Sequence, residues 1–233
     1  LFLDARYEKV RQDGQIRDVA LLTAVGVDLK GRRNILGVSV SLNEQEIHWR
    51  TFLQSLVRRG LQGVQLIVSD DHAGLKAARQ AVFGGIPWQR CQFHLQQNAS
   101  QHVPHQNMKP EVANDLRMIF NAPNRTTAQQ YLAQIVQKYA KNASKLADWI
   151  EQAIPEGLTV FDFPAHHQKK LRTTNGVERL NREIRRRTAV VGIFPHEESC
   201  LRLTSAVLME IDDEWQVGRV YLSFQEQDQT APS

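Results

Sequence analysis

The chain has 233 residues, of which 42% are hydrophobic, and a formal net charge of +4 at pH 7. This length is enough to bury one large core, or a core that carries an inserted unit. Two cysteines exclude a disulfide framework, and no stretch approaches the roughly 18 apolar residues of a membrane span. We therefore expect a cytoplasmic protein with no membrane partner. The chain begins inside a strand-like pattern, so we also expect a portion that precedes it.

Positive charge is concentrated in one part of the chain. Between Lys169 and Arg187 there are eight Lys or Arg residues and two Glu residues. A cluster of this kind is often a solvated face, but it also suits a polyanionic partner. The segment is therefore a candidate nucleic-acid contact.

The first residues alternate as a β-strand does, which places Asp4 on the face opposite Leu1 and Leu3. Asp13-Gly14 predicts a tight hairpin turn, and Lys30-Gly31 predicts a second turn. The three strands are expected over residues 1–7, 19–27 and 34–40. A carboxylate within a strand is costly to bury, so Asp4 is expected at an open edge or facing cations.

A helix is predicted to start at Asn43-x-x-Glu46 and to end at Gly60. The apolar run Val64–Val68 then predicts a buried central strand in parallel pairing. Ser69-Asp70-Asp71-His72 follows at once, before a helix from about residue 73 to 82. Catalytic groups gather at such carboxyl ends of strands in open α/β sheets, so Asp70 or Asp71 is a candidate acid.

A further short strand is predicted over Pro87–Phe93, and it carries Cys91 and leads to His94. The Cys-x-x-His spacing is half of a zinc site, which His102 and His105 would complete. The alternative is a buried thiol beside a hydrogen-bonded histidine. Because one such pair is a weak signal, we favour the alternative.

Helical patterns fill residues 95–154, and Pro155-Glu-Gly157 interrupts them. A structureless connection of that length would be unusual, so we predict an all-helical insertion in an α/β frame. The predicted division is 1–94 for the first part of the core, 95–157 for the insertion, 158–225 for the second part and 226–233 for a tail.

The segment Arg172–Pro195 contains an amphipathic helix with Asn175 as its expected N-cap. At about 100° per residue, one stripe of this helix is apolar and buried, whereas Glu178, Arg182 and Arg185 share another. Asn175-x-x-Glu178 also resembles a capping box, in which the glutamate only caps the helix. The catalytic interpretation of Glu178 therefore depends on partner acids elsewhere.

The order of elements supplies those partners. Three hairpin-connected strands, a helix, a strand ending in acid, a helix and another strand match a ribonuclease H-like fold, a mixed sheet of strand order 3-2-1-4-5. In that order the first and fourth strands are neighbours, so Asp4 and Asp70 come together, and the helix of Glu178 can cross them. Oxygen ligands of this kind suit two Mg²⁺ or Mn²⁺ ions, which activate a water or a 3′-hydroxyl for attack on a phosphodiester.

Five stretches make the chain resemble the Mutator-type transposases of bacterial insertion sequences, within the DDE transposase superfamily. They are LDARYEKVR, VSDDHAGLKAA, RCQFHLQQN, FDFPAHH and RTTNGVERLNREIRRRTAVVGIFP. The resemblance implies a catalytic triad of Asp4, Asp70 and Glu178, with Asp71 as a weaker rival of Asp70. It also implies that the helical segment is the inserted domain of the family, and that Cys91 and His94 organise the site beside Asp70. The N-terminal DNA-binding region of the family is not in this sequence.

From these observations we predict a transposase catalytic core that cleaves transposon ends and transfers the 3′-hydroxyl to target DNA. The resemblance implies a homodimer or larger assembly on DNA, associated with the nucleoid. We expect five arginines to contact phosphates: Arg172, Arg179, Arg182, Arg185 and Arg186. The alternatives are a nuclease of the same fold that hydrolyses without joining, and an inactive DNA-binding protein derived from a transposase.

Overall fold

A computed structural model of the chain describes residues 1–224, apart from the side chains of Asn175 and Glu178. The predicted tail, residues 226–233, lies outside the described residues, as does Gln225. Within the described part of the chain, no helix is both long enough and apolar enough to cross a membrane.

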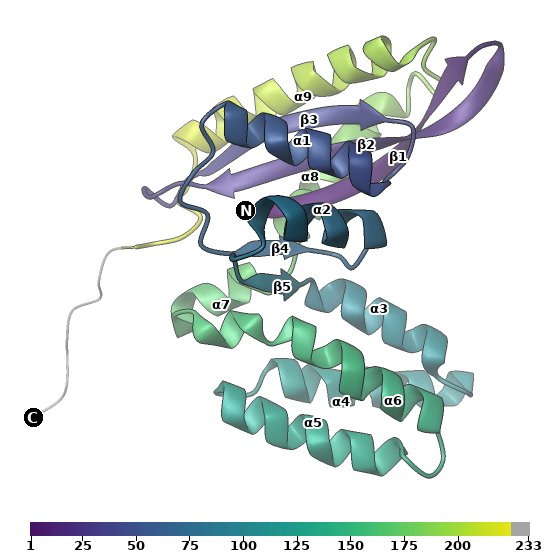
Figure 1. The fold of residues 1–233 in the computed structure, drawn as a ribbon, viewed down its shortest axis with the longest axis vertical. Coiled ribbons are helices and arrows are strands. Elements are labelled where there is room, and N and C mark those ends of the chain that lie inside the picture. The colour runs from purple at the N-terminus through teal and green to yellow at the C-terminus, as the bar shows by residue number, and fades with distance from the viewer. Residues whose placement is uncertain (225–233) are drawn as a thin grey trace, which may run out of the picture.

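A five-stranded mixed sheet forms the upper part of the molecule (Figure 1). Its strands are β1 (Phe2–Gln12), β2 (Gln15–Val27), β3 (Arg33–Ser41), β4 (Ile67–Ser69) and β5 (Trp88–Arg90). Their spatial order is β3-β2-β1-β4-β5, with antiparallel pairing among the first three and parallel pairing of β4 with β1 and with β5. The predicted strand order is confirmed.

The first hairpin is longer than the sequence pattern predicts. Asp13 and Gly14 form its turn with φ values of 50° and 77°, the positive pair that a two-residue hairpin turn of matching twist needs. Pairing therefore continues to Gln12 opposite Gln15. Polar residues at this end of β1 and β2 hide the alternation that would have extended the predicted strands.

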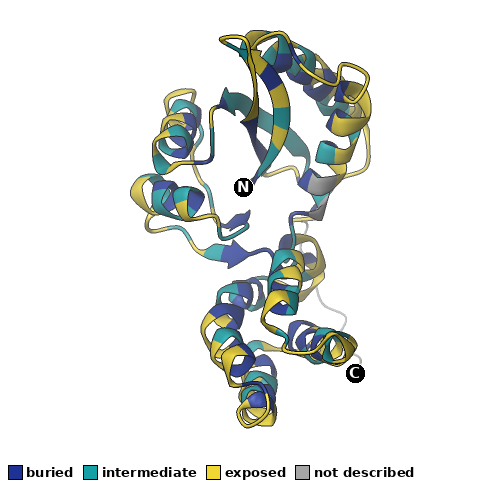
Figure 2. Cartoon of the chain, turned by 90° about the vertical axis from the view of Figure 1, so that its right-hand side faces the viewer, coloured by how far each residue is buried: buried dark blue, intermediate teal, exposed yellow. Residues whose placement is uncertain are grey.

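Helices cover both faces of the sheet, because alternate residues of each strand point to opposite faces. On one face, α1 (Glu46–Arg58) and α2 (Ala73–Phe83) pack against Leu3, Leu22 and Ile67. On the other, α8 (Asn175–Thr188) and α9 (Glu197–Val217) pack against Phe2, Leu21 and Val68. In Figure 2 the buried residues of these helices line their inner sides. Phe2 and Leu3 thus send neighbouring side chains to different layers, which puts Asp4 on the α8 side.

Between β3 and the helix that follows β5, three more predicted boundaries are wrong. The helix after β3 begins at Glu46, with Gln45 as its N-cap, because the Asn43 side chain instead accepts a hydrogen bond from the Gln45 N–H at 3.0 Å. The fourth strand is only three residues long. The fifth ends at Arg90, and the next helix begins at Gln92, within the span predicted as a strand.

Helices with a hydrophobic core of their own form the lower part of the molecule (Figure 1). They are α3 (Gln92–His102), α4 (Lys109–Phe120), α5 (Arg125–Tyr139) and α6 (Ser144–Ala153). A 3₁₀ turn at Gln106–Met108 precedes α4, and two more, at Ile154–Gly157 and Thr159–Asp162, lead to α7 (Ala165–Leu171). That these helices are a separate domain stays a prediction.

Candidate active site

Asp4 lies in β1, and Asp70 directly follows β4, the parallel strand beside it. Phe2 of β1 pairs with Val68 of β4, and each aspartate lies two residues further along its strand direction. Since alternate residues share a face, this register brings the two acids to the same edge of the sheet. Asp4 is buried, with 6% of its surface exposed, whereas Asp70 follows the end of β4 and is half-buried.

Asn181 connects Asp4 to helix α8. Its Nδ2 donates a hydrogen bond to Oδ2 of Asp4 at 2.6 Å, and its backbone carbonyl accepts one from the Arg6 guanidinium. A buried carboxylate without a hydrogen-bond donor would be costly, so this amide helps to keep Asp4 in place. The same two bonds hold α8 against β1.

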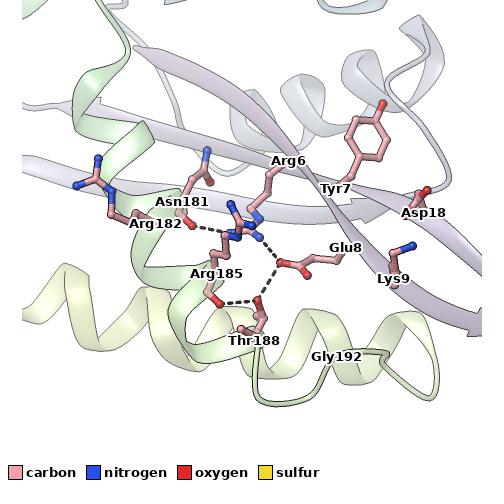
Figure 3. Close-up of a pocket in the computed structure, with 11 residues that line it drawn as sticks. Arg6, Tyr7, Glu8, Lys9, Asp18, Asn181, Arg182, Arg185, Thr188 and Gly192 are labelled. Atoms are coloured by element: carbon pink, nitrogen blue, oxygen red, sulfur yellow. Dashed lines mark hydrogen bonds and ion pairs between the residues drawn. The ribbon is translucent and has the colours of Figure 1, made fainter.

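The contacts between β1 and α8 continue toward the hairpin (Figure 3). Nη2 of Arg6 lies 2.7 Å from Oε1 of Glu8, and Glu8 accepts a hydrogen bond from the Thr188 hydroxyl at 3.0 Å. Asp4, Arg6 and Glu8 alternate along the strand, so all three face the helix. Helix α8 is therefore fixed to β1 over two turns.

Hydrogen bonds of Cys91 connect the start of α8 to the end of β4. Its N–H donates to the Ser69 carbonyl at 2.7 Å, beside Asp70. Its Sγ accepts hydrogen bonds from the Thr174 N–H and hydroxyl, both at 3.4 Å. The thiol is buried, and although burial would raise its pKa, hydrogen bonds from His94 and Thr174 lower it.

His94 lies close to both acids. Hydrogen bonding with Cys91 raises the pKa of its imidazole to about 9, and the negative charges of Asp4 and Asp70 act in the same direction, against the effect of burial. The raised pKa favours the protonated, positively charged form of the imidazole beside the two acids.

The zinc set of Cys91 and His94 completed by His102 and His105 does not form among the described residues. His94 and His102 are separated by eight residues of α3, which is about 12 Å along a helix axis. Among the described side chains, no three His, Cys, Asp or Glu residues form a group that could hold a metal ion. His102 instead stacks on Trp149, with ring centroids 5.0 Å apart.

Helix α8 begins one residue earlier than predicted. Thr174, rather than Asn175, is its N-cap, and the Val177 N–H bonds to the Thr174 carbonyl at 2.7 Å. Glu178 then falls one position beyond that of a capping-box glutamate. The Glu178 side chain lies outside the described residues, so its catalytic role stays a prediction.

Asp71 forms ion pairs with two cationic side chains. It lies 3.1 Å from Nζ of Lys76 and 2.9 Å from Nη1 of Arg90, and both cations also contact Glu156. This network joins α2 and β5 to the turn after α6. Oδ1 of Asp70 accepts a hydrogen bond from the His72 N–H at 3.3 Å. Because Asp71 is held in this network of ion pairs, Asp70 is the better candidate acid.

Glu44 and Tyr7, which no sequence pattern singles out, lie near Asp70. Glu44 is only 8% exposed, and burial, together with the charge of Asp70, raises its pKa. Gly74 lets the start of α2 approach this segment, because a Cβ there would lie 2.0 Å from the Glu44 carbonyl oxygen. No spacing in the sequence connects Glu44 to Asp70, since only the packing of α2 brings them together.

The predicted DNA-binding arginines lie in three different places. Arg182 and Arg185 line a groove of about 680 Å³ between α8 and the first hairpin, together with Lys9, Asn181 and Gly192 (Figure 3). Arg179 and Arg186 line a different hollow, between α8 and α9. Arg172 donates a hydrogen bond to Oδ1 of Asn121 at 2.8 Å, and so contacts the helical part of the molecule.

Comparison with protein families matches residues 1–218 to the family described as "Transposase, Mutator family". The chain belongs to the Mutator family of transposases. The transposase of insertion sequence element IS406 from Burkholderia multivorans is 60% identical over 96% of this chain. The ISRM5 transposase of Rhizobium meliloti is 44% identical over 96%, and that of IS256 in transposon Tn4001 of Staphylococcus aureus is 34% identical over 96%.

This Mutator-family chain corresponds to part of those relatives. It spans 58% of the IS406 transposase, 56% of the ISRM5 transposase and 58% of the IS256 transposase. The site described above falls within the matched residues.

Proposed function

We propose that this chain is the catalytic core of a DDE transposase with a ribonuclease H-like fold. One observation carries the proposal: the parallel pairing of β1 with β4 brings Asp4 and Asp70 to one edge of the sheet, where helix α8 crosses with Glu178 on its first turns. An acid within β1 and an acid just after the neighbouring β4, with a third on the helix held against β1, would supply the carboxylates that metal-dependent phosphodiester chemistry needs.

The donor set fits divalent cations. Asp4 and Asp70 supply the oxygen ligands that Mg²⁺ and Mn²⁺ prefer, and we assign the third carboxylate to Glu178. Oδ1 of Asn181 is buried and has no hydrogen-bond partner among the described residues, which suits a water molecule of a hydrated cation. Two bound ions would activate a water or 3′-hydroxyl and stabilise the leaving oxygen.

The residues of the chain have distinct tasks in this scheme. Asn181 holds Asp4 in one orientation, and Cys91 fixes the start of α8 through Thr174. Arg182 and Arg185, which are exposed in the groove beside the acids, bind phosphates of the DNA strand. Because contacts to phosphate carry no sequence information, recognition of particular transposon ends requires other parts of the protein. We infer a homodimer or larger assembly on DNA.

A strand-transfer assay tests the proposal. The chain is incubated with a short duplex that carries a free 3′-hydroxyl end, a supercoiled target plasmid and Mg²⁺ or Mn²⁺. We expect joined product with the wild type and none with Asp4→Asn or Asp70→Asn. Asp71→Asn is the matched control, since this neighbouring acid is paired with Lys76 and Arg90, and it should still join.

The outcomes separate the alternatives. Cleavage of DNA without joined product indicates a nuclease that only hydrolyses. Binding of DNA without cleavage or joining, with either ion, indicates an inactive DNA-binding protein and contradicts the catalytic proposal.

A further inference from the structure

The turn between α8 and α9 exposes aliphatic side chains. Val190 is 89% exposed, Val191 42% and Ile193 38%. We call residues 189–193 the apolar tip. A group of exposed aliphatic residues indicates an interaction site when it is not simply part of a mixed surface.

The apolar tip is held firmly at both ends. The Val191 N–H bonds to the Thr188 carbonyl at 2.9 Å, and Thr188 is itself fixed to Glu8. On the other side, the Phe194 N–H bonds to the Lys9 carbonyl at 2.8 Å, and the Phe194 side chain is buried. The turn between these anchors contains Gly192 with a φ of 69°, a conformation that favours glycine. Hydrogen bonds at both ends therefore hold the tip in place where it projects from the sheet.

Cations lie in the groove on one side of the tip. Ala189 and Gly192 form one end of the groove that Arg182, Arg185 and Lys9 also line. Figure 3 shows Gly192 beyond Thr188, at the end of the row of side chains that runs along α8. Glu8 and Asp18 also line this groove, but Glu8 is paired with Arg6 at 2.7 Å, and the four cations Arg6, Lys9, Arg182 and Arg185 outnumber the two acids, so positive charge dominates there. This positive charge favours a polyanion as the partner of the tip over a protein surface that has few acidic residues.

We propose that the apolar tip is a wedge that inserts Val190 between stacked bases of a DNA duplex held in the groove. Apolar side chains beside phosphate-binding cations are used in this way by proteins that bend DNA, and insertion unstacks one base step. The proposal rests on the proposed function, which places DNA along α8. A tip of five residues is small against the roughly 800 Å² per partner of a stable protein interface, which argues against a second copy of the chain as its occupant.

Fluorescence of 2-aminopurine tests the wedge, because its emission rises when the base loses its stacking neighbours. A short duplex carries 2-aminopurine at several adjacent steps, so that each bound register reports. We expect emission to rise when the wild type binds, and most of that rise to be lost with Val190→Ser. Kd, measured by anisotropy of the same duplex, should change by less than about threefold, since phosphate contacts supply most of the non-specific affinity.

Two further variants sharpen the test. Leu29→Ser is the matched control, because Leu29 is 94% exposed in the turn before β3 and does not line the groove, so the full rise should remain. Val190→Leu keeps an aliphatic wedge and should also retain the rise. Circular dichroism is measured for each variant to check that it is folded.

The possible failures are distinguishable. DNA binding by the wild type without an increase in emission overturns the wedge and leaves the proposed function standing. An equal increase with Val190→Ser also overturns it. If Val190→Ser gives the same increase in emission as the wild type but changes the sedimentation coefficient of the protein, the tip is a protein interface and the wedge is wrong. If the wild type does not bind DNA at all, both proposals fail.

Discussion

Asn181 and Asp4, which are 177 residues apart in the chain, share a hydrogen bond of 2.6 Å from amide Nδ2 to carboxylate Oδ2. The backbone carbonyl of the same asparagine accepts a bond from Arg6. One residue of α8 therefore contacts two alternate side chains of β1. This arrangement holds the helix of Glu178 against the strand of Asp4.

Asn181→Ala should destabilise the chain. The variant removes a donor from a buried carboxylate, which costs about 1–3 kcal/mol of unfolding free energy. Urea unfolding measures the loss. In an Asp4→Asn background the same substitution should cost less, because no charged acceptor is left without this donor. Equal losses in the two backgrounds would show that the negative charge of Asp4 adds nothing to the strength of this bond.

Arg182→Ala and Arg185→Ala should each weaken DNA binding across all sequences. Each variant removes one phosphate contact from the groove, so the slope of log K against log salt should fall by about one unit. Arg186→Ala is the control from the same helix, because Arg186 pairs with Glu183 at 3.0 Å and faces the hollow beside α9. A loss of slope with Arg186→Ala as large as with the other two would mean that DNA covers both sides of α8.

The His94 imidazole should titrate near pH 9 in metal-free buffer. Its raised pKa means that the folded chain holds this proton more tightly than the unfolded chain does. Its contribution to stability is therefore complete below about pH 6.5 and is lost as the pH rises through about 9. NMR of the imidazole resonances follows the titration directly.

The same NMR experiment tests the partner of His94. Cys91→Ala removes the hydrogen bond that is the main cause of the shift, so the midpoint should fall toward the ordinary value of 6.5. A midpoint that stays near 9 in this variant would assign the shift to Asp4 and Asp70 instead.

Glu178→Gln should abolish metal-dependent cleavage while leaving the helix folded. The amide keeps the size of the side chain but is a poor ligand for Mg²⁺. Glu183→Gln is the matched control, because Glu183 is on the same helix and forms an ion pair with Arg186. Cleavage with Mn²⁺ and circular dichroism are measured for both. Full activity of Glu178→Gln would return that residue to a structural role.

Local patterns predict much of this fold. The alternation of residues 1–7 places Asp4 opposite Leu3, and the structure has Asp4 facing α8 while Leu3 packs beneath α1 and α2. Asp13-Gly14 predicts its turn correctly, and the order of elements predicts the strand order. Predictions fail where a side chain has a local alternative, as at Asn43, which bonds to a nearby backbone N–H instead of starting the helix.

The periodicity of α8 and the order of elements along the chain are enough to predict that Asp4, Asp70 and the helix of Glu178 belong to one part of the fold. Which neighbours complete the site depends on tertiary packing. Asn181 on Asp4, Thr174 on Cys91, and the separation of Arg172 and Arg179 from the groove all depend on contacts between distant segments. The physical reason is that a side chain's position on its own helix or strand follows from sequence spacing, whereas its partner depends on how two elements pack.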